Sequence, residues 1–244
     1  MSSDKCLVSV ASMGRENYNK GQLKLIRSAV ESGWDGDYLM SSVDGYCDEY
    51  MGVKIELGSW PVTRKHGVSW QHKDNPYQFK PYAIQEAIEK GYSKILWCDS
   101  SIRMVKNPNE LFEIAAERGV VAFDNIGYPL KNWISDWAIA CLKLSSEKLE
   151  SMPQIMACCI MFDFNNPIAI EILNAWIAGS LNGSFQHEEG NRPGYRASRH
   201  DQSYLSALLN LRGIEFLPYG NLVYPPHDTS GEYGSNFYFI NKGV

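Results

Sequence analysis

Short apolar runs alternate along this chain with segments of helical periodicity, and no other feature of the sequence limits the fold as strongly. The two most apolar runs are Lys94–Cys98 (KILWC) and Ile155–Phe162 (IMACCIMF). Such continuous runs are typical of strands that are covered on both faces. Further strands are expected at Cys6–Ala11, Asp37–Ser41, Val53–Leu57, Val120–Phe123 and Ile214–Leu217. Helical segments fall between these runs, at Gln22–Ser32, at Pro81–Lys90, before Gly119, after Asn166 and at Asp201–Arg212.

The alternation predicts an α/β fold with a mostly parallel mixed sheet flanked by helices. The length of 244 residues fits one large domain, and no linker or internal repeat divides the chain. In open α/β sheets, ligands bind beyond the carboxyl ends of the strands. The functional site is therefore expected at that edge of the sheet.

Composition and charge exclude several classes of protein. A net charge of −5 provides no basic face for nucleic acid, and no apolar run approaches the ~20 residues of a membrane helix. The first residues lack the features of a secretory signal. The six cysteines include no CxxC pair, and four of them lie in apolar segments, which is typical of free thiols, although the even count also permits a disulfide pair. These observations predict a cytoplasmic protein.

The first candidate for a reactive site is Asp99-Ser100-Ser101, which directly follows the run Lys94–Cys98. A carboxylate at the end of a buried strand is costly to desolvate unless a cation, a metal or a ribose hydroxyl pairs with it. The alternative is that Asp99 only caps a turn and that the two serines bond to local amides.

A second candidate is His200-Asp201-Gln202, at the start of a predicted helix. Asp201 is interpreted either as a functional carboxylate or as the N-cap of that helix. Asp163, which follows the run Ile155–Phe162, is predicted to line the same cleft. Aromatic residues make up 12% of the chain, and the candidates for stacking on sugar rings are Trp60, Trp70, Trp133 and Trp137. The helical spacing of Trp133 and Trp137 fits core packing equally well.

Two blocks of the sequence carry a resemblance to a known family. Phe79-Lys80-Pro81-Tyr82-Ala83-Ile84, followed by the strand that ends in Asp99-Ser100-Ser101-Ile102, resembles nucleotide-sugar-dependent glycosyltransferases of the GT-A fold. In that family a helix opening with Lys-Pro precedes a strand ending in a DxD motif. Arg199-His200-Asp201-Gln202-Ser203-Tyr204 is similar to the family's DQ segment. The resemblance spans roughly residues 6–227, with residues 1–105 on the nucleotide-sugar side and residues 106–244 on the acceptor side and in the C-terminal tail.

The resemblance implies an enzyme of the hexosyltransferase class, which moves a sugar from a nucleoside-diphosphate sugar to a glycan or glycolipid-type acceptor. Asp201 would be the general base of an inverting reaction, or would position hydroxyls in a retaining one. His200 would orient Asp201 or contact phosphate. The implied donor-binding residues are Ser12, Arg64, Lys80, Asp99, Ser100, Ser101 and Arg103. An acceptor carried on a lipid would require peripheral contact with the membrane.

The resemblance also implies a divalent cation, Mn²⁺ or Mg²⁺, that neutralises the leaving diphosphate. Its implied ligands are Asp99, Ser101 and His227. The third position of the DxD-like motif is Ser101, so one carboxylate is missing, and Lys80, Arg64 or Arg103 is the alternative source of positive charge.

Two other functions fit parts of the sequence. One is a non-catalytic carbohydrate-binding protein on the same fold, in which the loss of the second acid has ended catalysis. The other is a nucleotidyltransferase, although that class usually carries a glycine-rich, cationic loop after the first strand, and Ser12–Lys20 holds one Gly.

Overall fold

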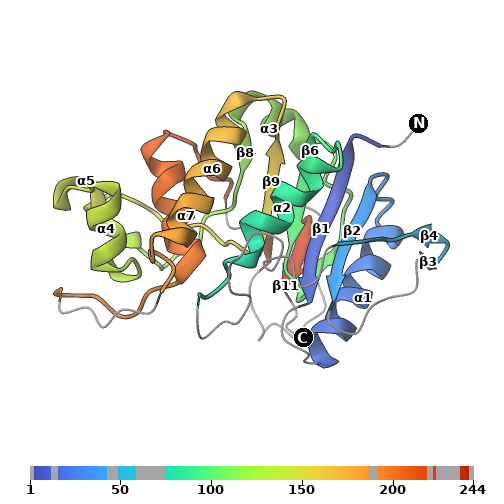
Figure 1. The fold of residues 1–244 in the computed structure, drawn as a ribbon, viewed down its shortest axis with the longest axis horizontal. Coiled ribbons are helices and arrows are strands. Elements are labelled where there is room, and N and C mark those ends of the chain that lie inside the picture. Colours follow the sequence, from blue (N-terminus) through green and yellow to red (C-terminus); the bar gives the residue numbers. More distant parts are fainter. Residues whose placement is uncertain are drawn as a thin grey trace.

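The centre of the protein is a six-stranded sheet whose strands, in spatial order, are β5 (Glu56–Leu57), β2 (Asp37–Ser42), β1 (Lys5–Ala11), β6 (Lys94–Cys98), β9 (Cys159–Asp163) and β8 (Val120–Val121) (Figure 1). The pairs from β5 to β6 are parallel, and β9 is antiparallel to both of its neighbours. Five of the six strands therefore point the same way, which confirms the predicted mixed, mostly parallel sheet. The computed structural model describes residues 3–11, 16–42, 49–58, 75–186, 192–218, 222–223 and 237–241.

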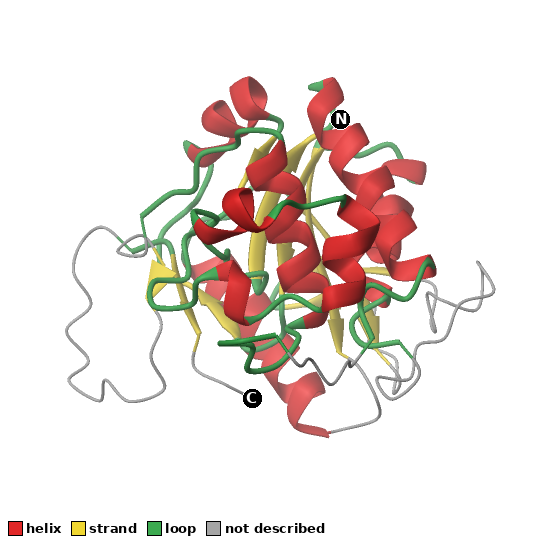
Figure 2. Cartoon of the chain, turned by 90° about the vertical axis from the view of Figure 1, so that its left-hand side faces the viewer, coloured by secondary structure: helices red, strands yellow, loops and turns green. Residues whose placement is uncertain are grey.

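Helices cover both faces of this sheet (Figure 2). One face packs against α2 (Phe79–Glu89), α6 (Pro167–Leu181) and α7 (His200–Leu211). The other face packs against α1 (Glu16–Glu31) and α3 (Leu111–Arg118). A smaller sheet lies on this second face and consists of β10 (Leu222–Val223), β11 (Phe239–Asn241) and β7 (Ile102–Met104). A separate two-stranded sheet is formed by β3 (Glu49–Tyr50) and β4 (Val53–Lys54).

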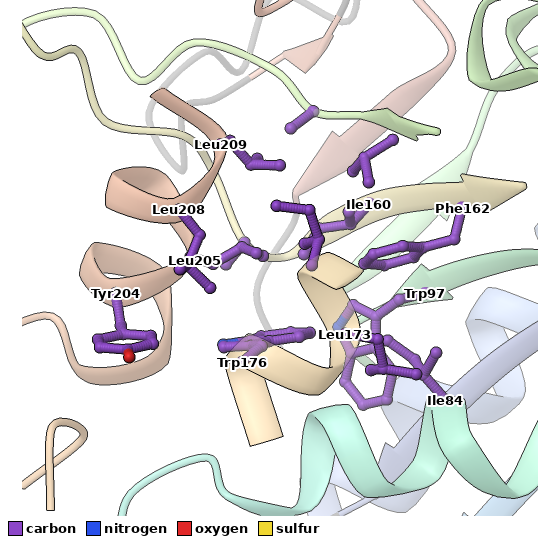
Figure 3. Close-up of a cluster of buried hydrophobic side chains, with 14 of the residues drawn as sticks. Ile84, Trp97, Ile160, Phe162, Leu173, Trp176, Tyr204, Leu205, Leu208 and Leu209 are labelled. Atoms are coloured by element: carbon purple, nitrogen blue, oxygen red, sulfur yellow. The ribbon is translucent and has the colours of Figure 1, made fainter. Parts of the chain in front are cut away.

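Alternating side chains divide the core between the two faces of the sheet. Along β6, Leu96 belongs to the cluster under α1 and α3, whereas Trp97 belongs to the cluster under α2, α6 and α7. Figure 3 shows Trp176 of α6 between the side chains of α7 and those of β6 and β9. Close contact between α6 and α7 depends on Gly179, because a Cβ there would come within 2.2 Å of the Tyr204 ring. This packing fixes where α7 begins.

An insertion between β8 and β9 forms one end of the molecule beside α7 (Figure 1). It contains the 3₁₀ turn η2 (Leu130–Asn132) and two short helices, α4 (Asp136–Leu142) and α5 (Ser146–Glu150). Both helices carry serine N-caps: Ala138 N–H donates to Ser135 Oγ (3.1 Å), and Lys148 N–H donates to Ser145 Oγ (3.3 Å).

Two predicted strands are shorter in the structure than the sequence pattern suggests. The run Ile155–Phe162 becomes a strand only from Cys159 onward, because its neighbour β6 ends at Cys98, the partner of Cys159. Ile155 makes one isolated bridge to Asp124 instead. The run Ile214–Leu217 contributes a single bridge, from Leu217 to Phe123.

The cysteines of the described segments are free thiols, as predicted, and Cys47 lies outside those segments. None of the helices in the described ranges combines the length and the apolar character that a membrane span needs.

Candidate functional site

A pocket of about 410 Å³ lies at the carboxyl end of β6, between α2, the start of α7 and the insertion. Four residues singled out from the sequence line it together, although they come from three separate parts of the chain: Lys80, Asp99, His200 and Asp201. The sheet thus places the site at the edge where it was expected.

Asp99 reaches the pocket because of its position on the strand. Residues two apart on a strand share a face, so the Asp99 carboxylate lies on the α2 side, with the Trp97 ring. Trp97 Nε1 donates a hydrogen bond to Asp99 Oδ1 at 2.9 Å. No described residue donates a hydrogen bond to Oδ2, and the side chain is 30% exposed. Because no described backbone amide of the following turn donates a hydrogen bond to the Asp99 carboxylate, the turn-cap interpretation of Asp99 is not supported.

Lys80 joins the two candidate carboxylates. Its Nζ lies 3.2 Å from Asp99 Oδ1 and 3.1 Å from Asp201 Oδ2, and it donates a hydrogen bond to the Ala157 carbonyl at 3.1 Å. The Lys80 side chain is 4% exposed, and the Tyr77 ring covers its ammonium at 4.8 Å. A cation in the first turn of a helix is opposed by the helix dipole, and here two carboxylates compensate for it.

Asp201 is the buried partner in this cluster, with a side chain that is 3% exposed. It is not an N-cap, because α7 begins at His200 and Arg199 occupies the N-cap position without a side-chain cap. Among the described residues, no hydrogen bond is aligned on Asp201 Oδ2. The 3.1 Å contact with Lys80 is therefore best described as an ion pair, which leaves this oxygen able to accept a proton.

Burial and charge set the protonation states of the cluster. Burial by itself lowers the pKa of the Lys80 ammonium, but the charges of Asp201 and Asp99 outweigh burial, and the net pKa is raised. Burial raises the pKa of Asp201 to about 6, although the Lys80 charge acts in the opposite direction. Lys80 is therefore charged at neutral pH, whereas Asp201 titrates near the pH at which a general base works best.

This shift has a measurable effect on stability. The Asp201 carboxyl titrates at its ordinary value of 3.8 when unfolded and at about 6 when folded, so the folded state binds more protons between these values. Raising the pH through this window therefore destabilises the fold, by about 3 kcal/mol in total. This loss of folding stability develops mainly between pH 4 and pH 6.

Urea unfolding of the wild type and Asp201→Asn at pH 4, 5, 6 and 7 measures this effect. As the pH rises through the series, the free energy of unfolding of the variant is expected to increase by about 3 kcal/mol relative to that of the wild type. Lys80, Asp99, His200 and Tyr77, which surround Asp201, are present in both proteins. A constant difference between the two proteins would show that the Asp201 pKa is not raised.

Two pocket residues adopt left-handed backbone conformations. Tyr77 has φ +58° and His200 has φ +52°, which costs a non-glycine residue on the order of 1–3 kcal/mol. Their rings lie 5.8 Å apart. His200 Nδ1 lies 2.7 Å from the Phe185 carbonyl oxygen; because a carbonyl only accepts, Nδ1 carries a hydrogen and a neutral His200 presents Nε2 as an acceptor. Strain of this kind is characteristic of functional sites.

The insertion and the residue before α7 together contribute an aromatic and cationic wall to the pocket. Trp133 and Arg199 line it, and the Arg199 guanidinium lies 5.5 Å from the Trp133 ring and 5.1 Å from the Tyr128 ring. Trp133 thus lies where a sugar-stacking residue was predicted. Trp137 is 53% exposed and does not line the pocket.

Other residues singled out from the sequence lie away from the pocket. Arg103 directs its Nη1 to the carbonyls of Gly21, Ser100 and Ile102, and neither Ser100 nor Ser101 lines the pocket. The prediction for Asp163 is wrong: its register partner in the sheet is Lys94, at the end of β6 opposite to Asp99, about 16 Å along the strand. Residues outside the described segments are Ser12, Trp60, Arg64, Trp70 and His227.

Several residues lining the pocket were missed from the sequence, Asn125 and Tyr77 among them. Asn125 follows β8, which runs in the same direction as β6, so the rule that located Asp99 could also have found it. Tyr77 precedes α2 and carries no recognisable sequence signal. Among the described residues, no group of three or more His, Cys, Asp or Glu side chains is placed to hold a metal ion.

No protein-family model matches the chain, and no curated protein matches it. Among solved structures, the chain is similar to the WbbM bifunctional glycosyltransferase in its apo form, with a TM-score of 0.61 and 13% identity; the match covers 100% of this chain and 46% of WbbM. It is also similar to apo mouse xyloside xylosyltransferase 1, with a TM-score of 0.57 and 10% identity over 96% of each chain. The chain therefore has a fold found in glycosyltransferases, and it spans about half of the WbbM chain.

Proposed function

We propose that this protein is a glycosyltransferase that moves a sugar from a nucleoside-diphosphate sugar to a carbohydrate acceptor. The observation that carries the proposal is the pairing of Asp99 and Asp201 around Lys80 at an open pocket. Two carboxylates from different elements, one partly exposed and one buried, provide two different environments for acids in one cavity. The similarity to solved glycosyltransferases supports the proposal at the level of the fold.

Asp201 is assigned the role of the base. Its raised pKa and its place in the pocket suit it to accept the proton of the acceptor hydroxyl as that oxygen attacks the sugar. In a retaining reaction the same carboxylate would position hydroxyls instead. Lys80 holds Asp201 and Asp99 at a fixed separation, and we assign it a positioning role rather than a direct contact with the diphosphate, because its ammonium already lies within 3.2 Å of three oxygens.

Asp99 is assigned to the donor side. Its Oδ2 accepts no hydrogen bond from the described residues and its side chain is partly exposed, so one carboxylate oxygen is available to a cation. Mg²⁺ is commonly held by one or two carboxylates together with substrate phosphates and water, and the described residues fit that arrangement with Mg²⁺ or Mn²⁺. Ser101 and His227 are the further ligands that the resemblance implies. Such an ion would neutralise the charge of the departing diphosphate.

The charges in the pocket also favour a cation. Lys80 and Arg199 balance Asp99 and Asp201, so the charged groups of the described pocket wall sum to zero. A nucleoside diphosphate brings several negative charges that these groups leave uncompensated. We therefore expect its affinity to depend on a divalent ion or on Arg64, which the resemblance also places on the donor side.

Thermal unfolding with nucleoside diphosphates tests the proposal. At one hundred times its Kd, a ligand that binds only the folded state adds about 2.7 kcal/mol, which raises the Tm of a protein of this size by roughly 5–10 °C. Uridine and guanosine diphosphates are compared with Mn²⁺, Mg²⁺ and EDTA in separate arms. Asp99→Asn is expected to remove the increment that depends on the metal.

A coupled assay for release of nucleoside diphosphate, together with the thermal unfolding experiment, separates a glycosyltransferase from a non-catalytic protein. A non-catalytic carbohydrate-binding protein would bind sugars but would release no nucleoside diphosphate from sugar nucleotides in a coupled assay. If neither uridine nor guanosine diphosphate raises the Tm in any arm, the glycosyltransferase proposal is wrong.

A further inference from the structure

The start of α7 presents an arginine that has no acidic partner among the described residues. The Arg199 guanidinium is half-buried between the Tyr128 and Trp133 rings, and no described carboxylate or carbonyl accepts a hydrogen bond from it. Arg192, seven residues earlier, is by contrast paired with Asp136 and bonded to the carbonyls of Lys131 and Ile134. Arg199 therefore brings to the pocket a positive charge that no described carboxylate contacts directly.

The surroundings of Arg199 prepare it to bind an anion. The Arg199 amide donates to the Trp133 carbonyl at 3.0 Å, so the backbone holds the side chain beside the rings. A guanidinium that is already oriented by aromatic faces loses little freedom when it forms hydrogen bonds. Its planar N–H groups match the two oxygens of a carboxylate or phosphate, and partial burial strengthens the attraction.

We propose that Arg199 binds an anionic group of the acceptor, so that the acceptor is an acidic carbohydrate carrying a carboxylate or a phosphate. This inference rests on the proposed function and names its substrate class. Arg199 lies two residues before Asp201, the assigned base, and its ring partners come from the insertion. Figure 1 shows the insertion and α7 at the opposite end of the molecule from β1, β2 and α1. Because Arg199 lies beside the assigned base and away from β1, β2 and α1, we assign the anion to the molecule whose hydroxyl meets Asp201 and not to the donor.

Matched pairs of small sugars test this inference. The α- and β-p-nitrophenyl glucuronides and galacturonides differ from the corresponding glucosides and galactosides by a carboxylate, and glucose 6-phosphate differs from glucose by a phosphate. Titration monitored by NMR gives the affinity of each probe. In at least one pair, the acidic member is expected to bind about tenfold or more tightly than the neutral one, and the carboxylate and phosphate arms distinguish the two sources of charge.

Two variants locate the effect. Arg199→Gln is expected to remove the preference for the acidic member, and Arg199→Lys, which keeps the charge but not the planar fork, to retain part of it. Arg196→Gln is the matched control, because Arg196 also lies near the Trp133 ring, at 5.8 Å, but is exposed and does not line the pocket. It should retain the full preference. If Arg199→Gln does not fold, the salt dependence of the wild-type preference and the Arg199→Lys variant carry the test.

Uridine and guanosine diphosphates are titrated in parallel. Equal affinity for acidic and neutral probes, alongside binding of a nucleoside diphosphate, overturns the acidic acceptor and leaves the proposed function intact. Absence of any nucleoside-diphosphate binding to the wild type counts against the proposed function itself. If Arg199→Gln weakens nucleoside-diphosphate binding as strongly as it weakens binding of the acidic probe, the guanidinium serves the donor and the inference is wrong.

Discussion

Lys80→Met is expected to lower the free energy of unfolding by about 3–5 kcal/mol at pH 7, as measured by urea denaturation. Methionine fills most of the volume of the lysine side chain but cannot compensate the charges of Asp99 and Asp201, which lie 3.2 and 3.1 Å from Nζ. It also leaves the Ala157 carbonyl without its donor. The cost is large because removing the cation of this cluster leaves two carboxylates close together without a charge partner, and Asp201 among them is desolvated.

Two further variants separate charge from packing. Lys131→Met removes an exposed ion pair with Glu150, in which the side chains are 38% and 64% exposed, and should cost no more than about 1 kcal/mol. The triple variant Lys80→Met, Asp99→Asn, Asp201→Asn should recover most of the lost stability, because uncharged side chains of similar size often replace a buried ionic cluster at little cost. If the triple variant is as unstable as Lys80→Met alone, the loss comes from packing and not from charge.

Asp201→Asn is expected to lower kcat for sugar transfer by a factor of about 10²–10⁴, the usual contribution of a general base. The fold should not suffer, because at pH 7 the native carboxylate is held charged in a buried place where burial disfavours the charge. The variant is therefore predicted to be at least as stable as the wild type while being nearly inactive, a combination that is typical of catalytic groups. Release of nucleoside diphosphate from the donor measures the rate.

Asp163→Asn is the matched control for this experiment. Asp163 is an equally buried aspartate, but it lies at the opposite end of the sheet and accepts hydrogen bonds from the Asn165 amide and side chain, both at 2.9 Å. Its replacement should leave transfer unchanged, whatever it does to stability. Full activity in Asp201→Asn, or an equal loss in Asp163→Asn, would remove Asp201 from the reaction.

The sheet was readable from the sequence wherever apolar runs were long and continuous. The strand Lys94–Cys98 was predicted residue for residue. Short elements escaped, because they carry too few residues to show a period. Both helices of the insertion are of this kind, at 7 and 5 residues, and so are β7 and the strands of the C-terminal tail. The late start of β9 was also hidden, since strand length there depends on where the neighbouring strand ends.

The sequence singled out both carboxylates but could not show how they are connected. Lys80 was expected to contact the diphosphate or the sugar of the donor, whereas the structure places it between Asp99 and Asp201. That contact depends on how α7 packs against α6, which local sequence does not reveal. One signal was present: a lysine in the first turn of a helix, where the dipole disfavours a cation, implies carboxylates close by.

The ammonium of Lys80 also ties the chemistry of the protein to the completion of folding. From its place on α2 it meets side chains and a carbonyl from the end of β6, from the approach to β9 and from α7. These segments come together only when distant parts of the chain have docked. Contacts between such distant segments form late and cooperatively. A partly folded chain therefore holds no assembled acid pair, and competence for reaction arises in the same transition as the native state.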